Sequence, residues 1–249
     1  MPRYFLKLAY NGAPYCGWQR QPADPSVQQT VEEALALVLR RDTPITGAGR
    51  TDTGVNARTM YAHFDTAEPI SDTHRLIGSL NGIVGRDIAI AGIFAVGDDA
   101  HARFDATSRT YKYFVHTRRS PFLYPFSWHC HFRLDVAAMN EAARSLLSVA
   151  DFTSFSKLHS NARTNICKVT EARWEELDEG RMVFTITADR FLRNMVRAVV
   201  GTLVEVGRGK LSLDDFKAIV ERRDRCAAGE SMPGHALFLW DITYPYPLG

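Results

Sequence analysis

The sequence contains few cysteines and no long apolar run. Its four cysteines are widely spaced and form no CxxC pair. We therefore expect four reduced thiols rather than disulfides or a zinc site. No stretch approaches the roughly 20 consecutive apolar residues that a membrane-spanning helix needs. These absences predict a cytoplasmic protein with no membrane partner.

Signatures of common cofactor and metal sites are also missing from the sequence. There is no Walker A motif, no GxGxxG, no HExxH and no zinc-finger spacing, which are the usual marks of nucleotide, dinucleotide and zinc sites. The turn Gly207-Arg208-Gly209 is too short to be a nucleotide fingerprint. We therefore expect no cofactor, no metal ion and no small-molecule cofactor partner.

The charge is almost balanced, at a formal +2 over 249 residues. The choice of basic residue is more informative, because 6 of the 30 basic residues are lysine and the rest are arginine. Guanidinium groups bind phosphate in a bidentate manner and stack on bases. A general compositional bias toward arginine would give the same count, so this observation alone leaves nucleic acid as one of two interpretations.

Alternating and amphipathic patterns predict an interleaved α+β chain. Segments rich in aliphatic and aromatic residues predict strands. They are 4–10, 60–65, 88–96, 111–117, 166–175, 182–188 and 236–244. Apolar spacing and capping residues predict helices. They are 26–40, 73–80, 136–148, 191–206 and 213–222, with Ser26, Asp72 and Ser212 as caps.

This order reads β-α-β-α-β and then β-α-β-β-α-α-β. It predicts an α+β fold with mixed or antiparallel sheets and helices on one face. The two halves have similar element order, which predicts two similar lobes, 1–104 and 105–249, with a cleft between them. Domain interfaces commonly hold active sites.

The segment from Gly47 to Arg58 carries the most chemistry. It places one carboxylate, Asp52, among glycines and small polar residues, with Arg50 and Arg58 on either side. Nearby cations favour the ionised form of a carboxylate, and an ionised carboxylate can act as nucleophile or base. Asp52 is therefore the candidate catalytic residue, although a tight turn held by an arginine–aspartate pair would have the same local pattern.

Two further candidates come from distant segments. In the stretch 190–197, a helix would place Arg190, Arg193 and Arg197 on one side, with Arg197 closest to the apolar stripe. A buried guanidinium needs a carboxylate partner, for which Asp52, Glu205 and Asp189 are candidates. Tyr111 begins a predicted strand among arginines, where it is either a core residue or a ring that stacks on a base.

Six stretches in order resemble the tRNA pseudouridine synthase A family. The motif Gly49-Arg50-Thr51-Asp52-Thr53-Gly54-Val55 resembles the catalytic motif of that family. The others are 8–12 with 15–19, 26–28, 101–113, 151–155 and 191–197. The resemblance runs from about residue 4 to residue 240, and the motif departs from the family only at Thr53, where alanine is common.

The resemblance implies an isomerase that converts uridine to pseudouridine in tRNA without a cofactor. It implies ferredoxin-like halves, uridines at positions 38, 39 and 40 of the anticodon stem-loop as targets, and a homodimer that binds tRNA. Asp52 matches the essential aspartate, Tyr111 the stacking tyrosine and Arg197 the arginine that pairs with the aspartate. Arg50 and Arg58 match less specifically and would contact phosphate or carboxylate.

Two alternatives remain at this level. A non-catalytic RNA-binding module needs basic and aromatic surface but no Asp52, and would bind RNA without making a product. A carboxylate-dependent hydrolase would need a second nearby acid or a metal cluster, and the motif offers arginines instead. The basic loop 154–168, including Lys157, His159, Arg163 and Lys168, is either a solvated surface or a nucleic-acid contact.

Overall fold

The computed structural model describes residues 1–157 and 163–248 of the chain. The described part contains five α-helices and a mixed set of β-strands, in the predicted order. The chain divides into two compact units. Unit 1 comprises Met1–Thr107 and Leu239–Gly249, and unit 2 comprises Ser108–Phe238. The predicted α+β class is confirmed, and the lobe boundary at 104/105 stays a prediction.

Unit 1 is built on an antiparallel sheet in which β1 pairs with both β4 and β3. The short strand β2 pairs with β3, and β9 is the neighbour of β3 on its other side. Bulges interrupt both ladders of β1 near its end. These strands are β1 (Arg3–Tyr10), β2 (Thr46–Gly47), β3 (Asn56–Asp65), β4 (Ile88–Val96) and β9 (Leu237–Thr243).

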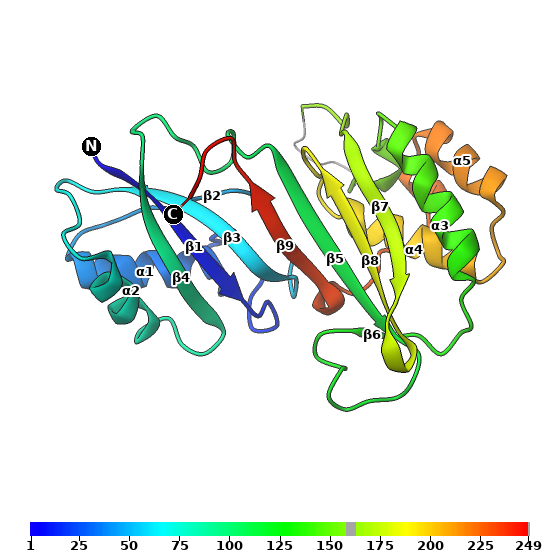
Figure 1. Cartoon of the computed structure of the whole chain (residues 1–249), viewed down its shortest axis with the longest axis horizontal. Helices are drawn as coiled ribbons and strands as arrows, with labels where there is room; N and C mark the ends of the chain where they lie inside the picture. The colour runs from blue at the N-terminus through cyan, green and yellow to red at the C-terminus, as the bar shows by residue number, and fades with distance from the viewer. Residues whose placement is uncertain (158–162, 249) are drawn as a thin grey trace. The chain divides into compact units, whose positions relative to one another are not determined.

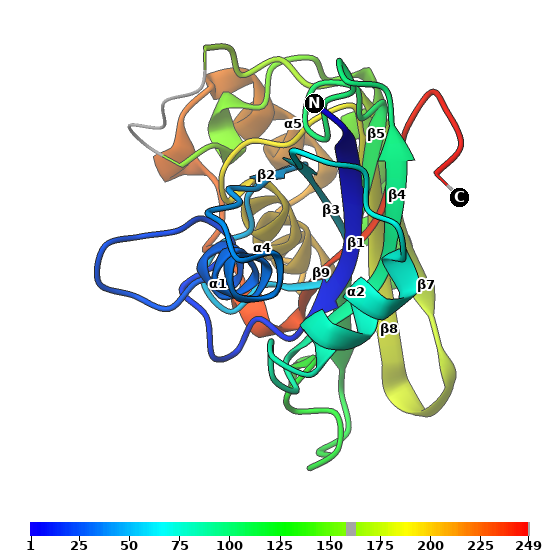
Figure 2. The same ribbon diagram turned by 90° about the vertical axis from the view of Figure 1, so that its left-hand side faces the viewer.

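Two helices pack in unit 1, α1 (Val27–Leu39) and α2 (Thr73–Asn81). Both start at the predicted caps, because the side chains of Ser26 and Asp72 accept hydrogen bonds from backbone N–H groups three residues later. The buried face of α1 comprises Val27, Val31, Ala34 and Leu35, as its apolar spacing predicts. Figure 2 shows α1 on one side of β1, and α2 packs against β4 and α1.

In the sheet strands of unit 2, β8 lies between β5 and β7 with antiparallel pairing. The two-residue strand β6 pairs in parallel with the end of β5, so the sheet is mixed. Figure 1 shows the three long strands running side by side. They are β5 (Ser108–His116), β6 (Trp128–His129), β7 (Val169–Glu176) and β8 (Arg181–Ala188).

Three helices cover unit 2, namely α3 (Val136–Ser145), α4 (Met195–Gly207) and α5 (Leu213–Arg222). Figure 1 shows α3 running beside β7, and α3 also contacts α4 and α5. Ser212 caps α5 in a reciprocal capping box with Asp215. Short 3₁₀ turns complete the fold; they are Leu146–Ser148, Thr153–Phe155, Asp178–Gly180, Arg225–Ala227 and Gly234–Ala236.

The predicted helix 191–206 begins four residues later than expected. Asn194 has φ 68° and ψ −1°, a left-handed conformation that interrupts a right-handed helix and that asparagine tolerates better than most residues. Arg190 and Arg193 therefore precede α4, and the prediction that they share one helical face with Arg197 is wrong. Within the described residues, no helix is long and apolar enough to cross a membrane.

Candidate active site

The five predicted site residues divide into two groups, one in each unit. Asp52, Arg50 and Arg58 belong to unit 1, and Tyr111 and Arg197 belong to unit 2. Within unit 1, the loop 48–55 joins β2 to β3 and carries Asp52. Asp52 is half-buried, whereas Arg50 is exposed. The backbone carbonyl of Asp52 accepts a hydrogen bond from the N–H of Val55 at 3.1 Å, which closes a turn around the carboxylate.

A second loop, after β1, holds the Asp52 turn in place. The hydroxyl of Tyr10 lies 2.9 Å from Oγ1 of Thr51, and both side chains are buried. The N–H of Trp18 donates to the carbonyl of Thr51 at 3.2 Å, and the N–H of Gly54 donates to the carbonyl of Tyr15 at 3.4 Å. The carboxylate-bearing turn is therefore fixed on both sides of Asp52.

The loop after β1 and the Asp52 turn lie so close together that a Cβ atom would not fit where they touch. Gly17 has φ +92°, and a Cβ at that position would lie 2.5 Å from the carbonyl oxygen of Thr51. A Cβ on Gly12 would likewise overlap the carbonyl of Val55. Glycine at these positions allows the backbone approach that positions Asp52.

Arg58 extends from β3, and its side chain is exposed. Its guanidinium carbon lies 4.4 Å from the centre of the Trp240 ring, a cation–π contact with β9. The ring face holds the guanidinium against the sheet, while its N–H edges remain able to donate. Arg58 is thus a pre-positioned cation on the unit that carries Asp52.

In unit 2, Tyr111 lies on β5 opposite Ile186 of β8 and is half-buried. The ring of Phe191 meets it edge to face, with centroids 5.0 Å apart and planes at 80°. This arrangement is favourable for two aromatic rings. Tyr113, two residues further along the same strand face, is fully buried, so the strand changes from core to partly exposed surface at Tyr111.

Arg197 lies in the first turn of α4 and is half-buried. Its Nε donates a hydrogen bond to the carbonyl of Met232, and the N–H of Met232 donates to the carbonyl of Arg197 at 3.1 Å. The guanidinium is thereby held at Nε by the backbone of Met232.

The two alternative carboxylate partners of Arg197 are engaged elsewhere in unit 2. Glu205 accepts a hydrogen bond from Arg208 at 2.7 Å and forms an ion pair with Lys210 at 3.1 Å. Asp189 accepts hydrogen bonds from the backbone N–H groups of Lys168 and Arg190. Each of these two carboxylates therefore already has local hydrogen-bond or ion-pair partners in unit 2.

The described ends of the basic loop 154–168 belong to the scaffold. Ser154 is buried and donates to the carbonyl of Ile219 at 2.7 Å, and the N–H of Lys157 donates to the carbonyl of Arg193. His159 and the rest of 158–162 lie outside the described residues. Both interpretations of this loop, a solvated surface or a nucleic-acid contact, therefore stay open.

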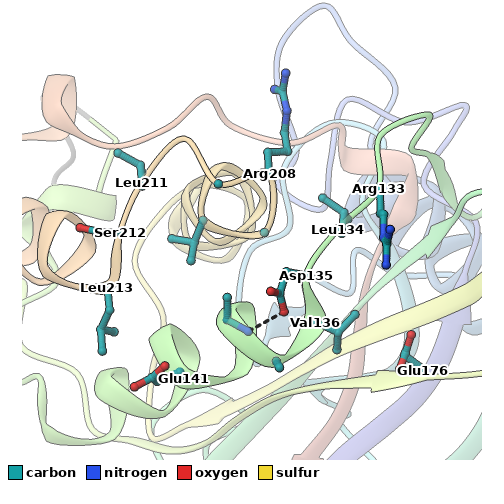
Figure 3. Close-up of a pocket in the computed structure, with 15 residues that line it drawn as sticks. Arg133, Leu134, Asp135, Val136, Glu141, Glu176, Arg208, Leu211, Ser212 and Leu213 are labelled. Carbon is teal, nitrogen blue, oxygen red and sulfur yellow. Dashed lines mark hydrogen bonds between the residues drawn. The ribbon is translucent and has the colours of Figure 1, made fainter.

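A pocket of about 860 Å³ opens in unit 2 at the end of α4 opposite to Arg197. Figure 3 shows charged side chains of both signs around it, including Arg133, Glu141 and Glu176. One of its polar side chains has a structural role, since Asp135 caps α3 by accepting from the N–H of Ala138 at 3.0 Å. None of the five predicted site residues lines it.

The chemistry available at Asp52 is that of a partly buried carboxylate on a unit that also carries Arg50 and Arg58. Such a group can attack a carbon centre or accept a proton. Throughout residues 1–157 and 163–248, no three histidine, cysteine, aspartate or glutamate side chains form a group that could hold a metal ion.

Comparisons with known proteins identify the family of the chain. A family model described as tRNA pseudouridine synthase matches residues 142–245. The chain is also similar, over nearly its whole length, to curated proteins named tRNA pseudouridine synthase A. The protein of Parabacteroides distasonis is 56% identical, over 100% of this chain and 98% of its own length. The proteins of Bacteroides fragilis (54%, over 98% and 96%) and Bacillus subtilis (38%, over 95% and 97%) are also similar.

These full-length relatives, together with the matched model, define the class as a pseudouridine synthase, which is an isomerase. Within that class, the chain belongs to the tRNA pseudouridine synthase A family. The family resemblance inferred from the sequence motifs is thereby confirmed.

Several residues that shape the site were not among the five predicted. Tyr10 and Gly17 position the Asp52 turn, and Phe191 contacts Tyr111. All three lie in stretches that resemble the family, so the sequence motifs could have identified them. Met232 acts through its backbone, and no side-chain pattern could have identified it.

Proposed function

We propose that this enzyme converts uridine to pseudouridine at positions 38, 39 and 40 of the tRNA anticodon stem-loop. The observation that carries the proposal is the Asp52 turn, in which Tyr10 and Gly17 hold the residue before one half-buried carboxylate. A carboxylate in a well-held turn, on the unit that also carries Arg50 and Arg58, suits a reaction that needs one acid and no cofactor. Membership of the tRNA pseudouridine synthase A family supports the substrate.

The reaction rearranges bonds without a net change in atoms. The bond from ribose C1′ to N1 of uracil breaks, and C1′ bonds to C5. C5 then loses its proton, and N1 gains one. In this proposal Asp52 is the catalytic residue, acting by attack on the ribose, by attack on the base or by removal of the C2′ proton. Each role requires the ionised carboxylate.

Tyr111 is proposed to stack on the target uracil. The target nucleotide must leave its stack before it can react, which costs a few kcal/mol. Stacking on an aromatic ring returns about 1–3 kcal/mol per base. The half-buried position of Tyr111 and its edge-to-face contact with Phe191 support this role, because one partner holds the ring while part of it stays accessible.

Arg197 is proposed to pair with Asp52 across a cleft between two ferredoxin-like lobes, 1–104 and 105–249. The support is chemical. A guanidinium held at Nε by Met232 presents its remaining donors in a fixed direction, and a carboxylate accepts two parallel N–H bonds from such a fork. This pairing would hold the carboxylate in one orientation.

Arg50 and Arg58 are proposed to contact tRNA phosphates. Arg50 is exposed beside Asp52, and Arg58 is held on the Trp240 ring. Phosphate contacts supply much of the affinity for nucleic acid and make it depend on salt. We further propose that the enzyme acts as a homodimer in the cytoplasm, as the family resemblance implies.

The proposal is tested by incubating the protein with unmodified tRNA transcripts and mapping pseudouridine at each position. We expect pseudouridine at 38, 39 and 40 in those transcripts that have uridine there. Transcripts with cytidine at these positions are the matched control. Tight tRNA binding without any product would instead support the alternative of a non-catalytic RNA-binding module.

A further inference from the structure

A short segment before β9 holds the start of α4 in place. We call residues 228–233 the strap. Met232 and Arg197 form two hydrogen bonds with each other. The side-chain Nε of Arg197 donates to the carbonyl of Met232, and the N–H of Met232 donates to the carbonyl of Arg197. The side-chain amide of Asn194, the left-handed residue that precedes α4, donates to Oγ of Ser231 at 2.5 Å. The strap therefore contacts both the residue that starts the helix and the arginine in its first turn.

The next turn of α4 also lies against the strap. The N–H of Gly229 donates to Oγ1 of Thr202 at 3.0 Å. Gly201 has no room for a side chain, because a Cβ there would overlap the carbonyl oxygen of Glu230. The helix and the strap thus meet backbone to backbone over two turns, and a shift of the strap must move the groups bonded to it.

One side chain, Arg225, holds the strap itself. Its Nη1 donates to the carbonyls of Gly229 at 3.1 Å and Ala228 at 3.4 Å, and its Nη2 donates to Oγ of Ser231 at 2.8 Å. Ser231 is the same residue that accepts from Asn194. Arg225 is half-buried, and its planar fork reaches acceptors that the single ammonium of a lysine could not all reach.

The other end of the strap is bonded to the strand that carries Tyr111. The hydroxyl of Tyr113 donates to the carbonyl of Pro233 at 3.1 Å. Tyr113 is fully buried and lies two residues from Tyr111 on the same face of β5. The strap therefore connects β5, which carries Tyr111, to α4, which carries Arg197.

We propose that Arg225 is a positioning residue, which fixes the strap and through Met232 directs the guanidinium of Arg197. The inference rests on the proposed function of Arg197. Loss of Arg225 would release Ser231 and the carbonyls of the strap, while every group proposed to touch tRNA stays present. The rate of the chemical step should therefore fall, and the affinity for tRNA should not.

The test compares Arg225→Ala and Arg225→Lys with Arg222→Ala, a matched loss of one cation from an exposed position at the end of α5. Single-turnover formation of pseudouridine at saturating enzyme gives the rate, and filter binding of the same tRNA gives Kd. We expect Arg225→Ala to slow the rate about 10- to 100-fold, because small displacements at a reacting centre have effects of that size. Kd and the Arg222→Ala rate should stay within about twofold of wild type.

Arg225→Lys should recover part of the rate, since the ammonium keeps one charged donor group at this position. If Arg225→Ala does not fold, Ser231→Ala replaces it, because this change removes the acceptor that Arg225 and Asn194 share. Its single-turnover rate should fall and its Kd should stay near wild type, as expected for Arg225→Ala. In an Arg197→Lys background, Arg225→Ala should add no further loss, because the two residues act in series.

A rate for Arg225→Ala equal to that of Arg222→Ala would overturn the positioning role. So would a loss seen in Kd alone, or full additivity with Arg197→Lys. These outcomes differ from failure of the proposed function, in which wild-type protein itself forms no pseudouridine.

Discussion

The hydroxyl of Tyr10 lies 2.9 Å from Oγ1 of Thr51, the residue directly before Asp52. Both side chains are buried, so the hydrogen bond is shielded from water and its loss would leave a polar group unsatisfied. Together with Gly17, this contact makes the Asp52 turn part of the packed structure of unit 1 rather than a surface loop. The predictions below begin from that rigidity.

Gly17→Ala should reduce both stability and activity. The residue has φ +92°, and its new Cβ would meet the carbonyl oxygen of Thr51 at 2.5 Å. We expect a loss of about 1–3 kcal/mol in the free energy of unfolding, measured by urea denaturation, and a lower rate of pseudouridine formation. Gly78→Ala is the control, because Gly78 lies in α2 with open space around it. That change should add about 0.5–1 kcal/mol, and equal effects at the two positions would contradict the close-approach argument.

Tyr111 should act through its ring rather than its hydroxyl. Tyr111→Phe keeps the ring and its contact with Phe191, so activity should stay near wild type. Tyr111→Ala removes the stacking surface and should cost about 1–3 kcal/mol, measured as kcat/KM for tRNA. If both variants behave like wild type, Tyr111 is a structural residue and the stacking role is wrong.

Arg58→Ala should weaken tRNA binding in a salt-dependent way. If Arg58 contacts one phosphate, its loss should reduce the slope of log Kd against log salt by about 0.7–0.9. Arg75→Ala, another exposed arginine of unit 1 in α2, serves as the control for charge alone. Equal changes of slope in the two variants would assign the effect of Arg58 to net charge instead.

His63 should make stability depend on pH. It is 7% exposed, and its Nδ1 accepts a hydrogen bond from the N–H of Ala102 at 3.1 Å. Burial, with Arg3 and His101 nearby, lowers the pKa of His63 from 6.5 to about 4. Between these values the unfolded chain binds a proton that the folded protein does not. Stability should therefore be complete above pH 6.5 and fall as the pH drops toward 4, by up to about 1.4 kcal/mol per pH unit.

Urea unfolding at pH 7.5 and pH 5 measures this effect. His63→Asn keeps an acceptor for Ala102 but does not titrate, so it should lose less stability between the two pH values than wild type. An identical loss in both proteins would show that other groups cause the pH dependence.

Much of the fold could be predicted from the sequence because local signals agreed with tertiary packing. The caps Ser26, Asp72 and Ser212 start α1, α2 and α5 as expected. The prediction failed where a single residue departed from the local pattern. Asn194 takes a left-handed conformation, supported by its bond to Ser231, and this delays α4 within a segment of good helical periodicity.

The sequence predicts only those candidate site residues whose side chains carry recognisable chemistry. Asp52, Arg50 and Arg58 were identifiable because charges among glycines are visible in the sequence. The strap was not, because it acts through the backbone of residues such as Met232, whose hydrogen bonds depend on distant packing. Two-residue strands such as β6 likewise depend on their partner strand, β5, and have no periodicity of their own.

The measurement that tests the central claim most directly is tritium release from tRNA labelled at uridine C5, with wild-type protein and Asp52→Asn. Asparagine is nearly isosteric with aspartate but can neither attack nor accept the proton, so the variant should still bind tRNA with a similar Kd and release no tritium. Wild-type protein should release it as C5 bonds to the ribose. Tritium release by Asp52→Asn at a rate close to wild type would contradict the account.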